Sequence, residues 1–235
     1  MEKKKLTAAE KYAPEVVATG DGSHTLFIPS LGEHYHSFHS SVREAEHVYI
    51  HAGLEEARKV FGNDLNVFEI GFGTGLNALV TALAGAARQL QICYHSIEKY
   101  PLSKETCEAL NYCDFIEVPG CVEVFTSLHD APWGAEIKAG GLLLKKIDGD
   151  FFSFSPQIGF YHLIYFDAFG FRAQEEFWTE AVFEKCLKML CPGGILVTYA
   201  SKGLVRRNMA AAGFQVDKLP GPPGKREMVR AVKPL

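Results

Sequence analysis

Short apolar runs alternate with segments whose apolar residues recur every three or four positions along most of the 235-residue chain. The runs predict buried strands, and the helical spacing predicts amphipathic helices that pack against them. Strands are expected at residues 65–70, 90–98, 142–147, 161–167 and 195–199, helices at residues 44–61, 76–83, 101–110, 175–190 and 202–212, and a closing antiparallel pair at residues 214–219 and 228–232. This order predicts an α/β, Rossmann-like fold with a mostly parallel sheet and a C-terminal antiparallel hairpin.

The first sixty residues show a different pattern. Residues 1–20 are polar and are expected to be loosely held, whereas residues 25–28 predict a short strand. Residues 31–41 combine three histidines with Tyr and Ser and show no apolar periodicity, which is typical of a loop that faces a ligand. These histidines lack a helical H-x-x-x-H spacing and an obvious carboxylate partner, so the sequence favours no metal over a metal site. We expect residues 1–60 to form an N-terminal extension on the substrate face and residues 61–235 to form the Rossmann-like domain.

Three alternating glycines, Gly71, Gly73 and Gly75, follow the strand at residues 65–70. Glycine accepts a positive φ angle and lets a ligand approach the backbone, and the helix that follows offers unpaired N–H groups. The dinucleotide fingerprint needs a third small residue at position 76, which is leucine here. Together with Glu69 on the strand, this spacing favours a ligand with a charged amino-acid end, such as S-adenosylmethionine. The alternative is a tight strand-to-helix turn that binds nothing.

Acidic residues stand at the ends of three further strands. Glu98 ends the second strand, where a carboxylate can accept hydrogen bonds from both hydroxyls of a ribose. Asp150 follows the third strand and is placed to meet an adenine amino group. Asp167 ends the fourth apolar run, beside the expected ligand crevice, and is the candidate catalytic residue. The alternatives are a surface Glu at a strand end and, for Asp167, a helix-capping or structural role.

The composition, 47% hydrophobic and 22% charged residues, is ordinary for a soluble globular protein with a full core. No apolar run is long enough to cross a bilayer, and no apolar signal core follows the first residues, so we expect a cytoplasmic protein without a membrane partner. The six cysteines form no C-x-x-C pair. Their scatter predicts reduced, mostly buried thiols instead of a disulfide framework or a zinc site.

The net charge of -4 is unevenly distributed along the chain. Residues 200–235 contain eight Lys and Arg against two Asp and Glu, which gives 8 − 2 = +6 and leaves -10 for the rest. A basic end on an acidic body is a candidate phosphate-binding face. The alternative is an ordinary solvated charged surface.

Four separated segments resemble one known family. They read GEHYHS at residues 32–37, EIGFGTGLN at 69–77, DAF at 167–169 followed by Trp178, and TYASKGLVRR at 198–207, with GF at 213–214 and GKREM at 224–228 extending the match. They resemble the methyltransferase domain of the bifunctional bacterial enzyme that makes 5-methylaminomethyl-2-thiouridine in tRNA, and its stand-alone relatives. The resemblance covers residues 20 to 231. One departure is that residues 170–177 lack the prolines the family commonly has before the Trp, in a segment that shapes the substrate pocket.

The resemblance implies a class I S-adenosylmethionine-dependent methyltransferase. Its substrate would be the tRNA anticodon region, where the primary amine of 5-aminomethyl-(2-thio)uridine at the wobble position receives the methyl group. The chain stops where the bifunctional enzyme would continue into its flavin-dependent oxidase. We therefore expect a methyltransferase alone, with no flavin and no metal, whose aminomethyl substrate other enzymes supply.

The resemblance and the residue chemistry together assign the site. Asp167 would orient the amine and accept a proton. Cofactor-binding residues are expected to be Glu69, Gly71, Phe72, Gly73, Thr74, Gly75, Asn77, Glu98, Lys99, Asp150 and Asp167. Substrate-binding residues are expected to be Glu33, Tyr35, Phe169, Trp178, Lys202, Arg206, Arg207, Lys225 and Arg226. A Trp on an amphipathic helix is also a frequent core residue. Two other functions stay open: methylation of a small-molecule amine, and a non-catalytic module that binds RNA or a partner.

Overall fold

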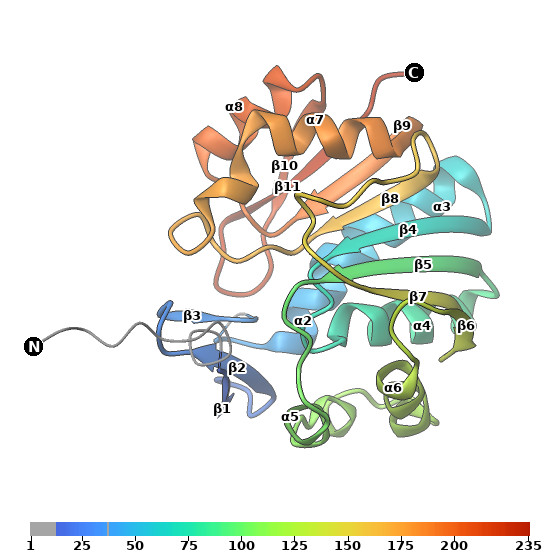
Figure 1. The fold of residues 1–235 in the computed structure, drawn as a ribbon, viewed down its shortest axis with the longest axis vertical. Coiled ribbons are helices and arrows are strands. Elements are labelled where there is room, and N and C mark those ends of the chain that lie inside the picture. Colours follow the sequence, from blue (N-terminus) through green and yellow to red (C-terminus); the bar gives the residue numbers. More distant parts are fainter. Residues whose placement is uncertain (1–12, 37) are drawn as a thin grey trace, which may run out of the picture.

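One large sheet with helices on both faces forms the body of the molecule, and a small three-stranded sheet lies beside it (Figure 1). The computed structural model describes residues 13–36 and 38–235. The small sheet is antiparallel and consists of β1 (Glu15–Ala18), β2 (His24–Ile28) and β3 (Glu33–His34). The sequence predicted β2 alone, because β1 and β3 are short and only partly buried. The expectation that residues 1–20 are loosely held lies mostly outside the described residues, and residues 15–18 instead form β1.

The large sheet has the strand order β10-β11-β9-β8-β4-β5-β7-β6. Its strands are β4 (Asp64–Ile70), β5 (Gln91–Glu98), β6 (Glu136–Ala139), β7 (Leu142–Asp148), β8 (Tyr161–Phe166), β9 (Leu190–Thr198), β10 (Gln215–Pro220) and β11 (Glu227–Val232). The five strands from β9 to β7 are parallel, whereas β10, β11 and β6 pair antiparallel. This confirms the predicted fold. The strand order reverses between β4 and β8, which is where such sheets open a ligand crevice.

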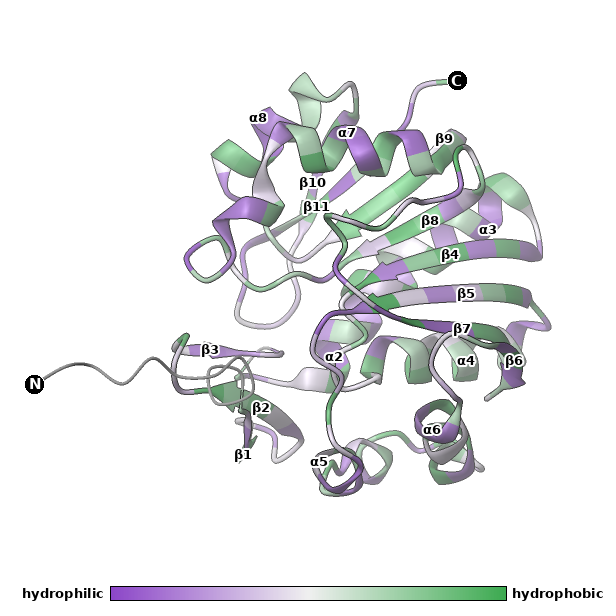
Figure 2. Ribbon diagram, in the orientation of Figure 1, coloured by the Kyte–Doolittle hydropathy of each residue, from purple (hydrophilic) through white to green (hydrophobic). Residues whose placement is uncertain are grey.

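Helices cover the large sheet on both faces (Figure 1). They are α2 (Ser41–Ala45), the π-helix η1 (Glu46–Leu54), α3 (Glu55–Phe61), α4 (Leu76–Arg88), α5 (Lys104–Glu108), α6 (Cys121–Asp130), α7 (Glu180–Met189) and α8 (Gly203–Ala211), with 3₁₀ turns at Tyr112–Asp114 and Glu175–Trp178. Two buried apolar clusters form the core, one under α4 and the helix at residues 41–61 and one under α7 and α8. Figure 2 shows that β8 and β9 are largely hydrophobic, as expected for strands covered on both faces.

The helix at residues 41–61 runs through α2, η1 and α3 and lies directly on the large sheet. A Cβ atom on Gly53 would come within 3.0 Å of the Val197 side chain and 3.2 Å of Tyr165, so a larger residue would require these side chains to shift. The middle of the helix is a nine-residue π-helix, a form found often at functional sites. Among the described residues, no helix is both long and apolar enough to cross a membrane.

Several sequence predictions need correction. The helix α6 was not predicted, because residues 111–142 show little periodicity; it begins after Gly120, whose φ is +81°. The predicted helix at residues 175–190 begins with a 3₁₀ turn, and β9 starts five residues earlier than expected. Cys113 and Cys121 form a disulfide, so the prediction of reduced thiols holds only for the other four cysteines. These two lie eight residues apart, Cys113 in a 3₁₀ turn and Cys121 at the start of α6, in a segment that the sequence left unassigned.

Candidate functional site

The glycine loop leads from the carboxyl end of β4 into α4. Gly71, Gly73 and Gly75 have φ angles of +94°, +49° and +74°, which L side chains rarely adopt. A Cβ atom on Gly71 would lie 3.2 Å from the backbone oxygen of Asp167, and one on Gly73 would lie 3.0 Å from the ring of Tyr35. The loop is therefore packed closely against the end of β8 and against the N-terminal segment, with no room for side chains.

A cleft opens where β4, β5, β7 and β8 end, at the point where the strand order reverses. Nine of the predicted cofactor-binding residues line it: Gly71, Phe72, Gly73, Thr74, Asn77, Glu98, Lys99, Asp150 and Asp167. Of the predicted substrate-binding residues, Tyr35 and Phe169 line it. The structure thus brings together residues that lie up to 134 positions apart in the sequence, from Tyr35 to Phe169.

Glu98 connects the glycine loop to the end of β5. Its two carboxylate oxygens accept the backbone N–H groups of Gly73, at 3.0 Å, and Tyr100, at 2.8 Å. Burial raises the pKa of Glu98, and these backbone hydrogen bonds oppose the rise. The backbone N–H of Lys99 also favours the charged form, and because a carboxylate has about four lone-pair sites, Glu98 can still accept a hydrogen bond from a ribose.

Asp150 forms the next side of the cleft. It accepts a hydrogen bond from Lys99 at 2.7 Å and one from the backbone N–H of Phe152 at 2.9 Å. The hydrogen bond from Lys99 lowers the pKa of Asp150. The pair lies on the outer part of the cleft, where a cofactor ring would be bordered by an ionised carboxylate.

Asp167 stands just beyond β8 with both carboxylate oxygens engaged. The hydroxyl of Tyr49 donates to Oδ1 at 2.5 Å, and the side-chain amide of Asn77 donates to Oδ2 at 2.8 Å. Burial raises the pKa of Asp167 to about 6, while the two hydrogen bonds favour the charged form. Asp167 is therefore mostly ionised at neutral pH, with its orientation fixed by two different helices.

Two predicted cofactor residues do not line the cleft: Gly75 and Glu69. Gly75 begins α4 behind the loop. The side chain of Glu69 is fully buried beneath the loop and accepts a hydrogen bond from Ser96 at 2.7 Å. Burial raises the pKa of Glu69 to about 8, so the group is protonated at neutral pH and offers no charge to a ligand.

Aromatic side chains form one wall of the cleft. The rings of Tyr35 and Phe169 meet edge to face, with centroids 4.9 Å apart. Trp178 is 1% exposed and donates its indole N–H to the Phe169 oxygen at 2.9 Å, so it supports the wall from the core. Glu33 lies beside the neighbouring Gly170, where a Cβ atom would be 3.4 Å from its carboxylate.

The structure separates the predicted basic residues into two groups. Lys202, Arg207 and Arg226 are exposed, and the ammonium of Lys202 lies 5.0 Å from the ring centre of Phe171, next to the aromatic wall; Arg206 is half-buried. Lys225 instead points inward. It forms an ion pair with the buried Glu44, and its ammonium lies 3.9 Å from the ring centre of Tyr199.

The sequence did not single out Tyr49, Glu44 or Tyr199 as site residues. Tyr199 donates its hydroxyl to the backbone oxygen of Ala168, next to the catalytic candidate. Tyr49 and Glu44 lie on the helix at residues 41–61, where the sequence pattern predicts a helix but no functional role. No local signal could have revealed Tyr49 and Glu44, because their partners lie more than 110 residues away.

The three histidines of residues 31–41 have separate surroundings. The ring of His34 packs on Phe27, with centroids 4.7 Å apart. The ring of His36 contacts the Thr74 hydroxyl at 2.9 Å, and burial lowers the pKa of His36 to about 4. His39 lies against Gly224. His36 thus supports the glycine loop from the N-terminal segment.

Comparisons with known proteins agree with this architecture. Residues 135–234 match the sequence model of a family described as S-adenosyl-L-methionine-dependent methyltransferase. The crystal structure of MNMC2 from Aquifex aeolicus has a TM-score of 0.78 and 24% sequence identity, and covers 96% of this chain and 74% of that one. The chain therefore shares the fold of this structure, and its C-terminal part is similar to the methyltransferase family model.

The relatives that match the chain in sequence have names that state a more specific activity. The tRNA 5-methylaminomethyl-2-thiouridine biosynthesis bifunctional protein MnmC of Burkholderia multivorans is 28% identical over 230 residues, which are 94% of this chain and 35% of that protein. The protein of the same name from Ectopseudomonas mendocina is 29% identical over 215 residues, 85% of this chain and 32% of its own length. The chain thus spans about a third of the length of the curated relatives it matches.

Proposed function

We propose that this protein transfers the methyl group of S-adenosylmethionine to the primary amine of 5-aminomethyl-(2-thio)uridine at the wobble position of tRNA. The observation that carries the proposal is the Asp167 carboxylate, held by Tyr49 and Asn77 in the glycine-loop cleft. The similarity to MnmC proteins over 94% of the chain supports the choice of acceptor. A tRNA substrate also suits the expected cytoplasmic location.

The lining of the cleft fits the proposed cofactor. The positive-φ glycines Gly71 and Gly73 leave the backbone open to the methionine end, Glu98 offers acceptors to the ribose, and Asp150 borders the adenine. When bound, S-adenosylmethionine supplies a methyl group that its positive sulfur already activates. The protein then has to align the acceptor, exclude water and keep the amine neutral.

Asp167 is the group that would act on the acceptor. With a pKa of about 6 it is mostly ionised at neutral pH and can accept a hydrogen bond from the amine. In the proposed transfer the nitrogen lone pair would form the new N–C bond, and the electron pair of the broken S–C bond would stay on sulfur. The nitrogen then carries an extra proton, which Asp167 can take and pass to solvent. Tyr35 and Phe169 form an apolar wall beside this path.

The tRNA would lie on the exposed cations near the aromatic wall. Lys202, Arg207 and Arg226 are the exposed basic side chains predicted for this role, and Arg206 lies beside them on α8. Lys225 has a different role in this proposal, because its ammonium is held by Glu44 and Tyr199. Lys225 would hold Glu44 and Tyr199 in place next to the cleft instead of contacting phosphate.

Transfer of labelled methyl groups tests the proposal. We expect label from S-adenosylmethionine to enter undermodified tRNA that carries 5-aminomethyl-uridine, but not fully modified tRNA or a small amine such as putrescine. Asp167→Asn keeps the shape of the side chain and should remove transfer while leaving cofactor binding measurable by calorimetry. Label in putrescine alone would instead favour the small-amine function, and cofactor binding without transfer to any acceptor would favour a non-catalytic module.

A further inference from the structure

A cluster of three potential metal ligands lies outside the cleft, at the edge of the large sheet. It consists of Cys93 and His95 on β5 and Glu136 on the edge strand β6. Their ligand atoms all lie within 4.8 Å of one another. None of the three residues lines the cofactor cleft, so the proposed methyl transfer does not account for them.

The geometry around His95 is that of a metal ligand. Its Nε2 atom lies 3.1 Å from the Glu136 carboxylate and 3.4 Å from the Cys93 sulfur, while its Nδ1 atom contacts the Tyr161 hydroxyl at 2.9 Å. Metal-binding histidines commonly have their second ring nitrogen held by such a partner, which fixes the orientation of the ring. The ring also stacks on Phe160, with centroids 6.1 Å apart. Nε2 is therefore held facing the two other ligand atoms.

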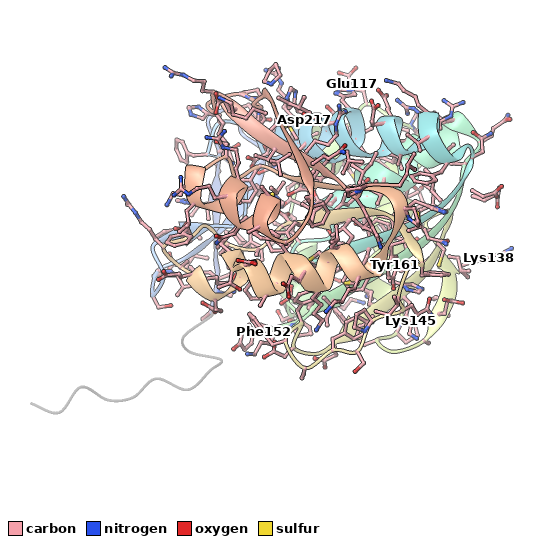
Figure 3. The ribbon with its side chains drawn as sticks, turned by 90° about the horizontal axis from the view of Figure 1, so that it is seen from above. Glu117, Lys138, Lys145, Phe152, Tyr161 and Asp217 are labelled. Carbon is pink, nitrogen blue, oxygen red and sulfur yellow. A yellow bond between two sulfur atoms is a disulfide. The ribbon has the colours of Figure 1, made fainter. Side chains whose placement is uncertain are left out.

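The strand register explains why the three residues meet. Cys93 and His95 are two positions apart on β5 and so point to the same face of the sheet. Lys145 on β7 pairs with His95 on one side and Glu136 on the other, so His95, Lys145 and Glu136 form one row across the sheet. Leu143, the β7 partner of Cys93, is 38% exposed, so this face is open to solvent and to an entering ion. Lys138, Lys145 and Tyr161, labelled in Figure 3, mark this side of the molecule.

We propose that Cys93, His95 and Glu136 bind a divalent metal ion of the zinc class. Sulfur, imidazole nitrogen and carboxylate oxygen are the three donor types that zinc uses in proteins, and water completes a three-ligand site. The ion would join β5 to β6 across β7 and so clip the edge strand of the sheet. The thiolate and carboxylate supply two negative charges, against which the Lys145 ammonium in the same row acts as the opposing charge.

Cobalt(II) is the probe, because a cobalt–thiolate bond gives a charge-transfer absorption band. We expect cobalt to produce this band in the full chain, zinc to remove it by displacement, and zinc to raise the melting temperature. Cys93→Ser should lose the band and the zinc-dependent rise. Tyr161→Phe should weaken binding by about 10- to 100-fold, and Lys145→Gln should strengthen it by removing the opposing charge.

Cys191→Ser is the matched control, because Cys191 is another partly exposed free cysteine and lies outside the cluster. It should keep the band. If Cys93→Ser does not fold, Glu136→Gln at an exposed position provides the same test through weakened cobalt affinity. The proposal is overturned if the full chain gives no band, if the band survives Cys93→Ser, or if Cys191→Ser loses it as well.

Discussion

At the scale of single residues, the chemistry of the site depends on how Asp167 is surrounded. Burial disfavours its charged form, and hydrogen bonds from Tyr49 and Asn77 favour it. The balance leaves the pKa at about 6, close to the range in which the group can both accept and release a proton. Tyr49 reaches Asp167 from a π-helix that precedes it by 118 residues.

Tyr49→Phe should raise the pKa of Asp167 further. The change removes a hydrogen bond to the charged form of Asp167 and leaves the ring in place, so the protonated form becomes more stable relative to the charged form. A hydrogen bond to a charged group of this kind corresponds to about one to two pKa units. Titration of ¹³C-labelled Asp carboxyl groups by NMR measures the pKa directly, and the acidic limb of methyl transfer should move to higher pH with it.

Tyr165→Phe is the control for this experiment. The Tyr165 hydroxyl is also buried, but its partner is Thr81 at 3.2 Å and not Asp167. The pKa of Asp167 should stay near its original value in this variant. An equal shift in both variants, or none in Tyr49→Phe, would show that the Tyr49 hydroxyl does not set the charge of Asp167.

At the scale of elements, the proposed function requires the turn between β4 and α4 to admit the cofactor. Gly73 combines a positive φ with a Tyr35 ring that would lie 3.0 Å from a Cβ atom, closer than ordinary contact, whereas Gly62, after α3, has a φ of +83° and no neighbour within 4 Å of a Cβ atom. Both glycines should therefore resist substitution through backbone strain, but only Gly73 also lines the cleft.

Gly62→Ala should lower the free energy of unfolding by about 1–3 kcal/mol, the cost of a side chain in a backbone conformation that is nearly exclusive to glycine, without changing cofactor affinity. Gly73→Ala should show a similar strain and also weaken S-adenosylmethionine binding by about tenfold or more, which is about 1.4 kcal/mol. Calorimetric titration and chemical denaturation separate the two effects. Unchanged cofactor affinity in Gly73→Ala would contradict the role of the loop as a cofactor cradle.

The elements that the sequence predicted well have strong local signals. The central strands are continuous apolar runs, and α4 and α7 have one apolar face, so their type follows from periodicity. The helix α6 and the strands β1 and β3 were missed because they are short or mostly exposed. The early start of β9 was missed because it includes Pro192 and two glycines, which usually end a regular element.

The site was predictable to the extent that its residues stand at strand ends. Glu98 ends β5, Asp167 directly follows β8 and Asp150 comes shortly after β7, and the parallel register brings those strand ends together. Glu69 also stands near a strand end, but the pleat of β4 turns it into the core. Lys225 could not be distinguished from its exposed neighbour Arg226, since its partner Glu44 comes from a different element.

At the scale of the whole molecule, ion pairs formed on folding leave only part of the basic segment at residues 200–235 as a candidate phosphate-binding surface. Lys225 pairs with Glu44, Arg230 with Glu56 and Lys218 with Glu227, so within the described part of the chain three of the eight cations in residues 200–235 have acidic partners. Lys202, Arg207 and Arg226 remain as exposed candidates for phosphate contacts. We therefore expect a modest number of phosphates to be neutralised when tRNA binds.

The salt dependence of tRNA binding tests this surface. The logarithm of affinity should fall linearly with the logarithm of salt concentration, and Arg207→Ala and Arg226→Ala should each reduce the slope by about 1. Lys59→Ala is the control. Lys59 is 70% exposed on α3, which leads into the amino end of β4, whereas the cleft opens at the carboxyl ends of the strands. A slope that is equal in all three variants and in the original protein would contradict the proposed tRNA face.

The central claim is tested most directly by mass analysis of tRNA nucleosides. Undermodified tRNA is incubated with the purified protein and S-adenosylmethionine carrying a heavy methyl group, then digested to nucleosides. We predict that 5-aminomethyl-(2-thio)uridine disappears and that its methylamino form appears with the heavy methyl group, whereas Asp167→Asn leaves the substrate unchanged. Persistence of the aminomethyl nucleoside with the cofactor bound, or a heavy methyl group on any other nucleoside, would contradict the account.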